Sequence, residues 1–147
     1  MESEDTSQQA IAERCESTVH RILHALNAKD FSASTWEFMP PEFTVETWAV
    51  LQPEHEDNNT MVLHQWLKSV SKFAAAHPDY HFEISDLATT INEEACTAES
   101  ILNVKVSGMY PGVLRKSVAS FVFHLIDGKC IPVKHVALAG HDVTNVW

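Results

Sequence analysis

A histidine in the last predicted strand is the residue best suited to chemistry in this sequence. Residues 130–139 (CIPVKHVALA) alternate so that His135 shares a face with apolar side chains, while Lys134 lies on the other face. Because the lysine ammonium needs water, we expect the face of His135 to point inward. There His135 could act as a general acid or base near neutral pH, or it could be a hydrogen-bonded core residue.

His124 lies in the preceding arm of the same predicted hairpin, and residues 127–128 (DG) supply the turn between the arms. A loop of two or four residues places His124 on the face of His135. A loop of three or five residues places Phe121 and Phe123 there instead. Both registers stay open, so the partner of His135 is either a second histidine or an aromatic wall.

Glu46 and Thr47 lie in a strand predicted over residues 43–51. Side chains in a strand alternate, so only one of the two can face inward. A carboxylate beside His135 would make a proton relay. The alternative for Glu46 is a solvated glutamate at the protein surface.

Weaker candidates lie on other predicted elements. An amide such as Asn103 could hold an enolate oxygen, although a solvent-facing polar stripe fits its position as well. Phe121 is a candidate substrate contact. Trp48 and Trp66 could line a pocket for an aromatic substrate or belong to the core.

Motifs for cofactor chemistry are missing. The sequence has no nucleophile motif, phosphate-binding loop or dinucleotide fingerprint. His20 and His24 have a spacing that zinc sites use on helices, but no third ligand accompanies them. The three cysteines are widely spaced, without metal-binding spacing, which fits a reducing compartment. We therefore predict no metal and no cofactor, which leaves cofactor-free proton transfer as the enzymatic class.

Length and charge restrict the possible partners. The 147 residues, 45% hydrophobic and 20% charged, are typical of one globular domain. A net charge of −10 argues against nucleic acid and anionic membranes. No apolar run approaches the roughly 18 residues that a membrane span needs. Residues 1–8 predict a disordered acidic tail rather than a targeting peptide, so we expect a cytoplasmic protein with one domain over residues 9–147.

Periodicity predicts an α+β domain. Helical spacing favours helices over residues 9–28 and 60–76, with Ser7 and Thr60 as possible N-caps, and a short helix over 31–39. Strands are predicted over 43–51, 80–90, 95–107 and the two hairpin arms. This order indicates three N-terminal helices packed on one face of a curved, mostly antiparallel sheet.

Four short strings, taken in order, resemble the SnoaL-like polyketide cyclase and isomerase family. That family lies in the nuclear transport factor 2-like superfamily, with ketosteroid isomerase and scytalone dehydratase. The strings are residues 22–30 (ILHALNAKD), 77–80 (HPDY), 108–112 (GMYPG) and 127–131 (DGKCI). They are similar to the ends of the first and third helices, a Gly-x-x-x-Gly connection and the turn of the last hairpin.

The resemblance implies a single SnoaL-like domain whose helices and bent sheet form a cone around an apolar pocket. Family members catalyse cofactor-free aldol cyclisation, isomerisation or dehydration, and others only bind or hold complexes together. Members often dimerise through the outer face of the sheet, so we expect a homodimer. If Phe121 and Phe123 faced outward with Val136 and Leu138, they would form an apolar patch that a second copy covers.

Matching the first strand to ketosteroid isomerase places Thr47 at the general-base aspartate of that enzyme, with Glu46 beside it. The oxyanion-binding tyrosine of the isomerase falls at Ile22, and its oxyanion-binding aspartate falls near Ser120 or Phe121. The resemblance therefore implies that the oxyanion pair is absent, which argues against a steroid-isomerase mechanism.

His135 lies where the last strand lines the pocket in these relatives. His81 is a further candidate for proton transfer, because it resembles a dehydratase histidine. We therefore expect a cofactor-independent cyclase, isomerase or dehydratase that acts on a small polyketide-like or terpenoid molecule. His135 would move the proton, with a polar partner from Glu46, Thr47 or His124. The alternative is a non-catalytic ligand-binding or assembly domain of the same fold.

Overall fold

The structure, a computed structural model, describes residues 7–47, 60–109 and 111–138. Within these residues, two helices and six strands follow one another: α1 (Gln8–Ala28), β1 (Thr44–Thr47), β2 (Thr60–Val62), α2 (Leu63–Ala76), β3 (His81–Asn92), β4 (Thr97–Ser107), β5 (Arg115–Ile126) and β6 (Lys129–Leu138). One sheet contains all the strands in the order β2-β1-β6-β5-β4-β3. Its pairs are antiparallel except for β1 with β6, which is parallel.

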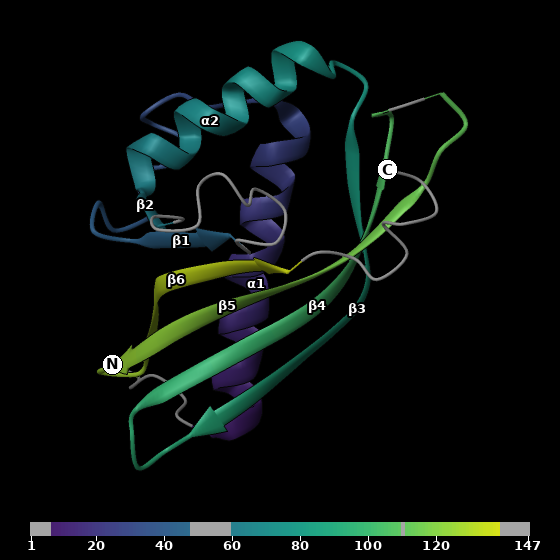
Figure 1. Cartoon of the computed structure of the whole chain (residues 1–147). Helices are drawn as coiled ribbons and strands as arrows, with labels where there is room; N and C mark the ends of the chain where they lie inside the picture. The colour runs from purple at the N-terminus through teal and green to yellow at the C-terminus, as the bar shows by residue number, and fades with distance from the viewer. Residues whose placement is uncertain (1–6, 48–59, 110, 139–147) are drawn as a thin grey trace.

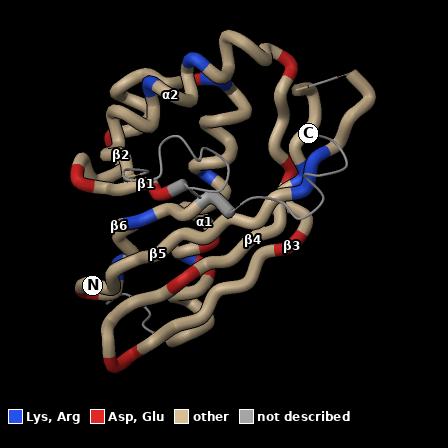
Figure 2. Tube along the Cα trace, viewed as in Figure 1, with Lys and Arg blue, Asp and Glu red and all other residues tan. Residues whose placement is uncertain are grey.

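The helices lie on the sheet in different ways. Helix α1 runs along one face, against β3, β4 and β6, and α2 lies across the end formed by β1 and β2 (Figure 1). The core fills the space between α1 and the long strands. None of the described helices is long and apolar enough to cross a membrane. Lys, Arg, Asp and Glu are scattered over helices, strands and turns (Figure 2).

Helix α1 forms as its sequence predicts. The Ser7 side chain accepts a hydrogen bond from the backbone N–H of Ala10, which caps the first turn. The apolar stripe through Cys15, Val19 and Ile22 is fully buried against the sheet. Burial of this stripe fixes which face of the sheet is the inner one.

The prediction of a short helix over residues 31–39 is wrong, because residues 33–38 form turns. The Asp30 carboxylate accepts hydrogen bonds from Ser32 and Thr35, and the Trp36 indole N–H donates to the Asp30 carbonyl. These local bonds compete with a helical backbone ladder. The described part of the chain therefore has two α-helices in place of the three that we expected.

The start of α2 also differs from the prediction. Thr60 does not cap the helix, because residues Thr60–Val62 form β2 and pair with β1. The helix begins at Leu63, where the Gln65 side chain accepts a hydrogen bond from the Val62 N–H. Residues 60–62, which local periodicity predicts as the first turn of this helix, thus form a strand at the edge of the sheet.

The last hairpin contains a tight turn and a β-bulge. Asp127 and Gly128 have φ angles of 53° and 76°, which makes a two-residue loop. Further along, Phe123 lies opposite Pro132 but Val122 lies opposite Lys134, so β6 has one extra residue. Proline has no N–H to donate, and bulges are among the few places where a sheet tolerates it.

The bulge decides which side chains accompany His135. Phe121 lies opposite His135 in the ladder, and His124 lies near the turn with its side chain exposed. The expectation that a two-residue loop puts His124 on the face of His135 is therefore wrong. Phe121 and Phe123 are buried in the core, so an outward apolar patch cannot include them.

Candidate functional site

His135 is the buried imidazole of the inner sheet face, as its alternation with Lys134 predicts. It retains 8% exposure. Its ring is stacked on Phe121, with centroids 4.4 Å apart and planes 17° apart. The ring of Trp66, from α2, lies 5.5 Å away at a tilt of 52°. Two aromatic residues predicted as substrate contacts are thus brought to the predicted proton-transfer group.

One hydrogen bond fixes the tautomer of His135. Its Nδ1 lies 3.1 Å from the backbone carbonyl of Ser120. A carbonyl can only accept, so Nδ1 carries the proton and Nε2 keeps its lone pair. Among the residues that the structure describes, Nε2 has no hydrogen-bond partner. The ring can therefore act as a base at Nε2 without breaking its anchor.

Burial controls the charge of this ring. Removal from water lowers the pKa of His135 from 6.5 to about 4, although the hydrogen bond to the Ser120 carbonyl partly opposes this change. The imidazole is consequently neutral at physiological pH. A neutral histidine held between aromatic rings can accept a proton. Its apolar surroundings disfavour the positive charge that it then carries.

The aromatic group continues away from His135. Trp66 contacts Trp36 edge to face, with centroids 5.8 Å apart, and contacts Phe43 at 6.1 Å. All three rings are buried. No sequence pattern selects Phe43. By sequence Trp36, like Trp48 and Trp66, could be either pocket lining or core, because nothing local indicates which rings surround His135.

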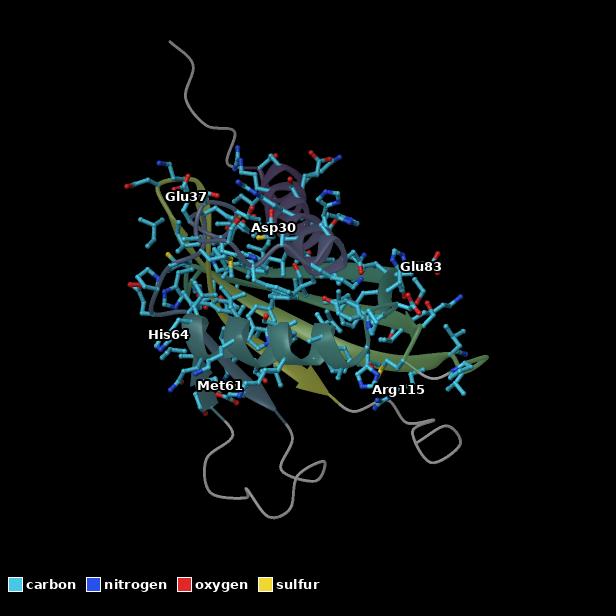
Figure 3. All side chains as sticks on the ribbon, turned by 90° about the horizontal axis from the view of Figure 1, so that it is seen from above. Asp30, Glu37, Met61, His64, Glu83 and Arg115 are labelled. Atoms are coloured by element: carbon cyan, nitrogen blue, oxygen red, sulfur yellow. The ribbon has the colours of Figure 1, made fainter. Side chains whose placement is uncertain are left out.

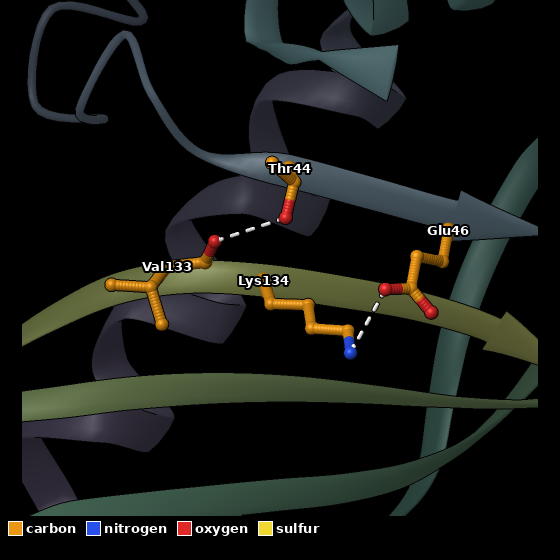
Figure 4. A network of polar contacts seen from close by, with 4 residues as sticks. All are labelled: Thr44, Glu46, Val133 and Lys134. Atoms are coloured by element: carbon orange, nitrogen blue, oxygen red, sulfur yellow. Dashed lines mark hydrogen bonds and ion pairs between the residues drawn. The ribbon is translucent and has the colours of Figure 1, made fainter. Parts of the chain in front are cut away.

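Glu46 is not brought to His135. The parallel pairing sets Val45 opposite His135, and Val45 is buried. Glu46 therefore lies on the outer face, where its carboxylate is 2.9 Å from the Lys134 ammonium (Figure 4). Nearby, the Thr44 hydroxyl donates to the carbonyl of Val133, the bulged residue.

Thr47 and Trp48 lie at the end of the described part of β1 and just beyond it. The backbone of Thr47 pairs with Ala137 at the end of β1. Trp48 lies outside the described residues. Their predicted roles as base position and substrate contact remain predictions.

The other candidates lie at the surface. Asn103, His81 and His124 are exposed, on β4, β3 and β5 respectively, and none contacts His135. His20 and His24 are exposed on α1. Within residues 7–47, 60–109 and 111–138, no three His, Cys, Asp or Glu side chains gather as metal ligands would. The described part of the site thus consists of one histidine and an apolar wall.

A cavity of about 570 Å³ lies elsewhere, where the end of α2 meets the connection between β4 and β5. Its lining includes His77, Asp79, Met109 and Leu114, and none of the rings around His135. Figure 3 shows Arg115, next to the lining residue Leu114, at the opposite end of the molecule from His64 in the first turn of α2. No local sequence pattern indicates this cavity, because segments far apart in the chain form its wall.

Neither a protein-family model nor a curated protein matches the sequence. Solved structures do match. A nuclear transport factor 2-like protein with a cystatin-like fold from Novosphingobium aromaticivorans superposes with a TM-score of 0.65 at 13% identity, over 89% of this chain and 82% of that one.

The chain has the nuclear transport factor 2-like fold. A provisionally named dehydratase of this fold from Streptomyces avermitilis has a TM-score of 0.65 at 16% identity, and the match covers 89% of this chain and 96% of that one. A SnoaL-like protein of unknown function from Burkholderia thailandensis has a TM-score of 0.60 at 17% identity, with 93% and 100% covered. The fold predicted from the four short strings is confirmed.

Proposed function

We propose that this chain is a cofactor-independent enzyme that moves a proton on a small, carbon-rich molecule. The reaction would be a cyclisation, an isomerisation or a dehydration of a polyketide-like or terpenoid intermediate. The observation that carries the proposal is the neutral His135 ring, anchored at Nδ1 by the Ser120 carbonyl and unpaired at Nε2 among the described residues.

In this mechanism Nε2 takes a proton from a carbon next to a carbonyl group, and the electron pair moves onto the carbonyl oxygen. The Nδ1–H bond to Ser120 strengthens as the ring becomes cationic, which stabilises the imidazolium. Return of the proton to another carbon completes an isomerisation. Its delivery to a departing hydroxyl group completes a dehydration and releases water.

The aromatic rings support the choice of substrate. Phe121 and Trp66 surround the imidazole with apolar rings, an environment suited to an aromatic or polyene portion of a ligand. Water kept away from His135 would prevent premature protonation of a reactive enolate. The provisional assignment of the Streptomyces neighbour as a dehydratase is compatible with this class of chemistry.

A second candidate is a non-catalytic binding or assembly domain. The observation in its favour is the close cover of the His135 ring by Phe121 and Trp66, which leaves it 8% exposed. In that case His135 is a core residue that satisfies the Ser120 carbonyl. The two candidates differ in whether a ligand reaches Nε2.

Exchange of carbon-bound hydrogen distinguishes them without knowledge of the natural substrate. The protein is incubated in deuterium oxide with a panel of polyketide-like phenols and 1,3-diketones, and loss of the α-proton signals is followed by NMR. A proton-transfer enzyme should speed exchange for at least one compound above the buffer rate. His135→Asn keeps an N–H near Ser120 but removes the base, so exchange should fall by about 10²–10⁴-fold.

The exposed His124 provides the matched control. His124→Asn should leave exchange unchanged, because its side chain does not contact His135. Exchange that persists in His135→Asn would refute the role of His135. Ligand binding without exchange in the wild-type protein would favour the binding domain.

We also propose a homodimer formed through the outer face of the sheet. Ile101 is 49% exposed there, and Val122 and Val136 are half-buried. Covering these side chains would remove apolar surface from water. Light scattering should report twice the monomer mass at micromolar concentration, and Ile101→Asp should shift it to the monomer. A wild-type monomer would contradict this proposal.

A further inference from the structure

Two of the three cysteines lie together at the contact between α1 and β6. Cys15 belongs to the buried stripe of α1 and is completely buried, whereas Cys130 follows the hairpin turn and is half-buried. The Cys130 thiol donates a hydrogen bond to the carbonyl of Ile11, 3.4 Å away and one helical turn before Cys15. Because Cys15 follows Ile11 by one helical turn, this bond brings the Cys130 sulfur beside Cys15, and both are free thiols.

The two thiols have different surroundings. The contact with Cys130 and burial in the core raise the pKa of Cys15 far above its ordinary value. The contact with Cys15 and the positive charge of Arg14 lower the pKa of Cys130, against the opposing effect of burial. One Arg14 guanidinium nitrogen donates to the Gly128 carbonyl at 3.0 Å, which holds the cation beside the turn that leads to Cys130.

A half-buried thiol beside a completely buried one is an arrangement that a reactive dithiol needs. A thiolate is the nucleophile in cysteine chemistry, and an adjacent cation increases its population. Because Cys130 is half-buried and Cys15 is completely buried, Cys130 is the group that an oxidant meets first, and Cys15 is the neighbour that can resolve the product. Cys96 is exposed on the turn between β3 and β4 and belongs to a separate region.

We propose that Cys15 and Cys130 form a redox-active dithiol, which a peroxide closes to an intramolecular disulfide that joins α1 to β6. The site is separate from the proposed function, because neither thiol contacts His135. The disulfide would nevertheless constrain β6, the strand that carries His135 beyond the bulge.

The chemistry requires only hydrogen peroxide as the oxidant. The Cys130 thiolate attacks one peroxide oxygen, an S–O bond forms, and the O–O bond breaks with loss of hydroxide, which is protonated to water. The Cys15 sulfur then attacks the sulfenic acid of Cys130. An S–S bond forms, the S–O bond breaks, and hydroxide leaves with the Cys15 proton as a second water. Two thiols lose two electrons in total, and one peroxide gains them.

The test uses the full chain, reduced and then treated with one equivalent of hydrogen peroxide. Remaining thiols are alkylated after unfolding, and the mass and the peptide pattern are measured without a reductant. We expect loss of two hydrogen atoms, one alkylated cysteine, and a cross-linked peptide that contains Cys15 and Cys130. Dithiothreitol should reverse the change completely.

Single substitutions identify the cysteines involved. Cys96→Ser is the matched control and should form the same cross-link, since Cys96 lies elsewhere. Cys130→Ser should abolish the cross-link and leave Cys15 available for alkylation after unfolding. A disulfide that includes Cys96 in the wild-type protein, or oxidation of Cys130 to sulfinic acid while Cys15 stays a thiol, would overturn the proposal.

The role of Arg14 is tested separately on the folded protein. Arg14→Gln should slow alkylation of Cys130 by iodoacetamide roughly two- to tenfold, because the nearby cation favours the thiolate. Alkylation of the exposed Cys96 in the same sample should be unchanged. An equal rate of alkylation at Cys130 in both proteins would show that the Arg14 cation does not favour the Cys130 thiolate.

Discussion

The imidazole of His135 is stacked on the phenyl ring of Phe121, with centroids 4.4 Å apart, across neighbouring strands of the sheet. The stack places a titratable ring against an apolar surface and exposes little of it to water. This relationship explains why His135 is neutral near pH 7, and it connects the stability of the core to pH.

The free energy of unfolding should fall as the pH decreases from 6.5 toward 4. The folded pKa of His135 is about 4, below the 6.5 of an unfolded histidine, so the unfolded chain binds the proton more readily. The contribution is complete above pH 6.5 and declines through this window, by roughly 3 kcal/mol over its full width. Urea unfolding at a series of pH values measures it.

His135→Asn should remove this part of the pH dependence, because asparagine does not titrate. His124→Asn is the control and should keep the wild-type slope, since His124 is exposed. A wild-type slope in His135→Asn would mean that other groups cause the acid sensitivity. His135 would then not have the depressed pKa.

Two glycines with positive φ angles should respond differently to alanine. Gly108 has φ of 82°, and an added Cβ would lie 1.8 Å from the Asp79 carbonyl oxygen. Gly112 has φ of 73°, but a Cβ there would meet nothing within 4 Å. Gly112→Ala should therefore lower the free energy of unfolding by about 1 kcal/mol, through backbone strain alone.

Gly108→Ala adds a collision with backbone to the same strain. We expect it to lower the free energy of unfolding by about 1–3 kcal/mol more than Gly112→Ala, as overpacking does. Chemical denaturation of both variants under one condition gives the comparison. Equal losses in the two variants would show that Gly108 does not pack closely against the backbone of Asp79.

The ion pair between Glu46 and Lys134 should contribute little to stability. Its side chains are 41% and 39% exposed, so water and salt screen the attraction. A double-mutant cycle with Glu46→Gln and Lys134→Gln should give a coupling below about 1 kcal/mol, which decreases further at high salt. Glu46→Gln should also leave proton exchange unchanged. A large loss of exchange in Glu46→Gln would contradict this prediction and show that Glu46 takes part in proton transfer.

Local chemistry was sufficient to predict much of the fold. The Asp127-Gly128 turn, the Ser7 cap and the stripe of α1 each depend on neighbouring residues, and each is confirmed. The alternation of Lys134 with His135 correctly predicted that the histidine faces inward, because an ammonium group must remain hydrated.

Tertiary structure decided what surrounds that histidine. The bulge at Val133 changes the strand parity, so Phe121 rather than His124 accompanies His135. Pro132 was its only local indication, and proline alone does not specify a bulge. Parallel pairing of β1 with β6 likewise sets Val45 inward and Glu46 outward, which no local pattern determines.

The sequence by itself determined the turn, the cap, the alternation and the buried histidine, because each follows from bonds and hydration within a few residues. Only the tertiary structure decided the aromatic wall around His135 and the meeting of Cys15 with Cys130. Those contacts join residues far apart in the chain. Their existence depends on how helices and strands share one core, where packing selects a single register among several that local chemistry allows.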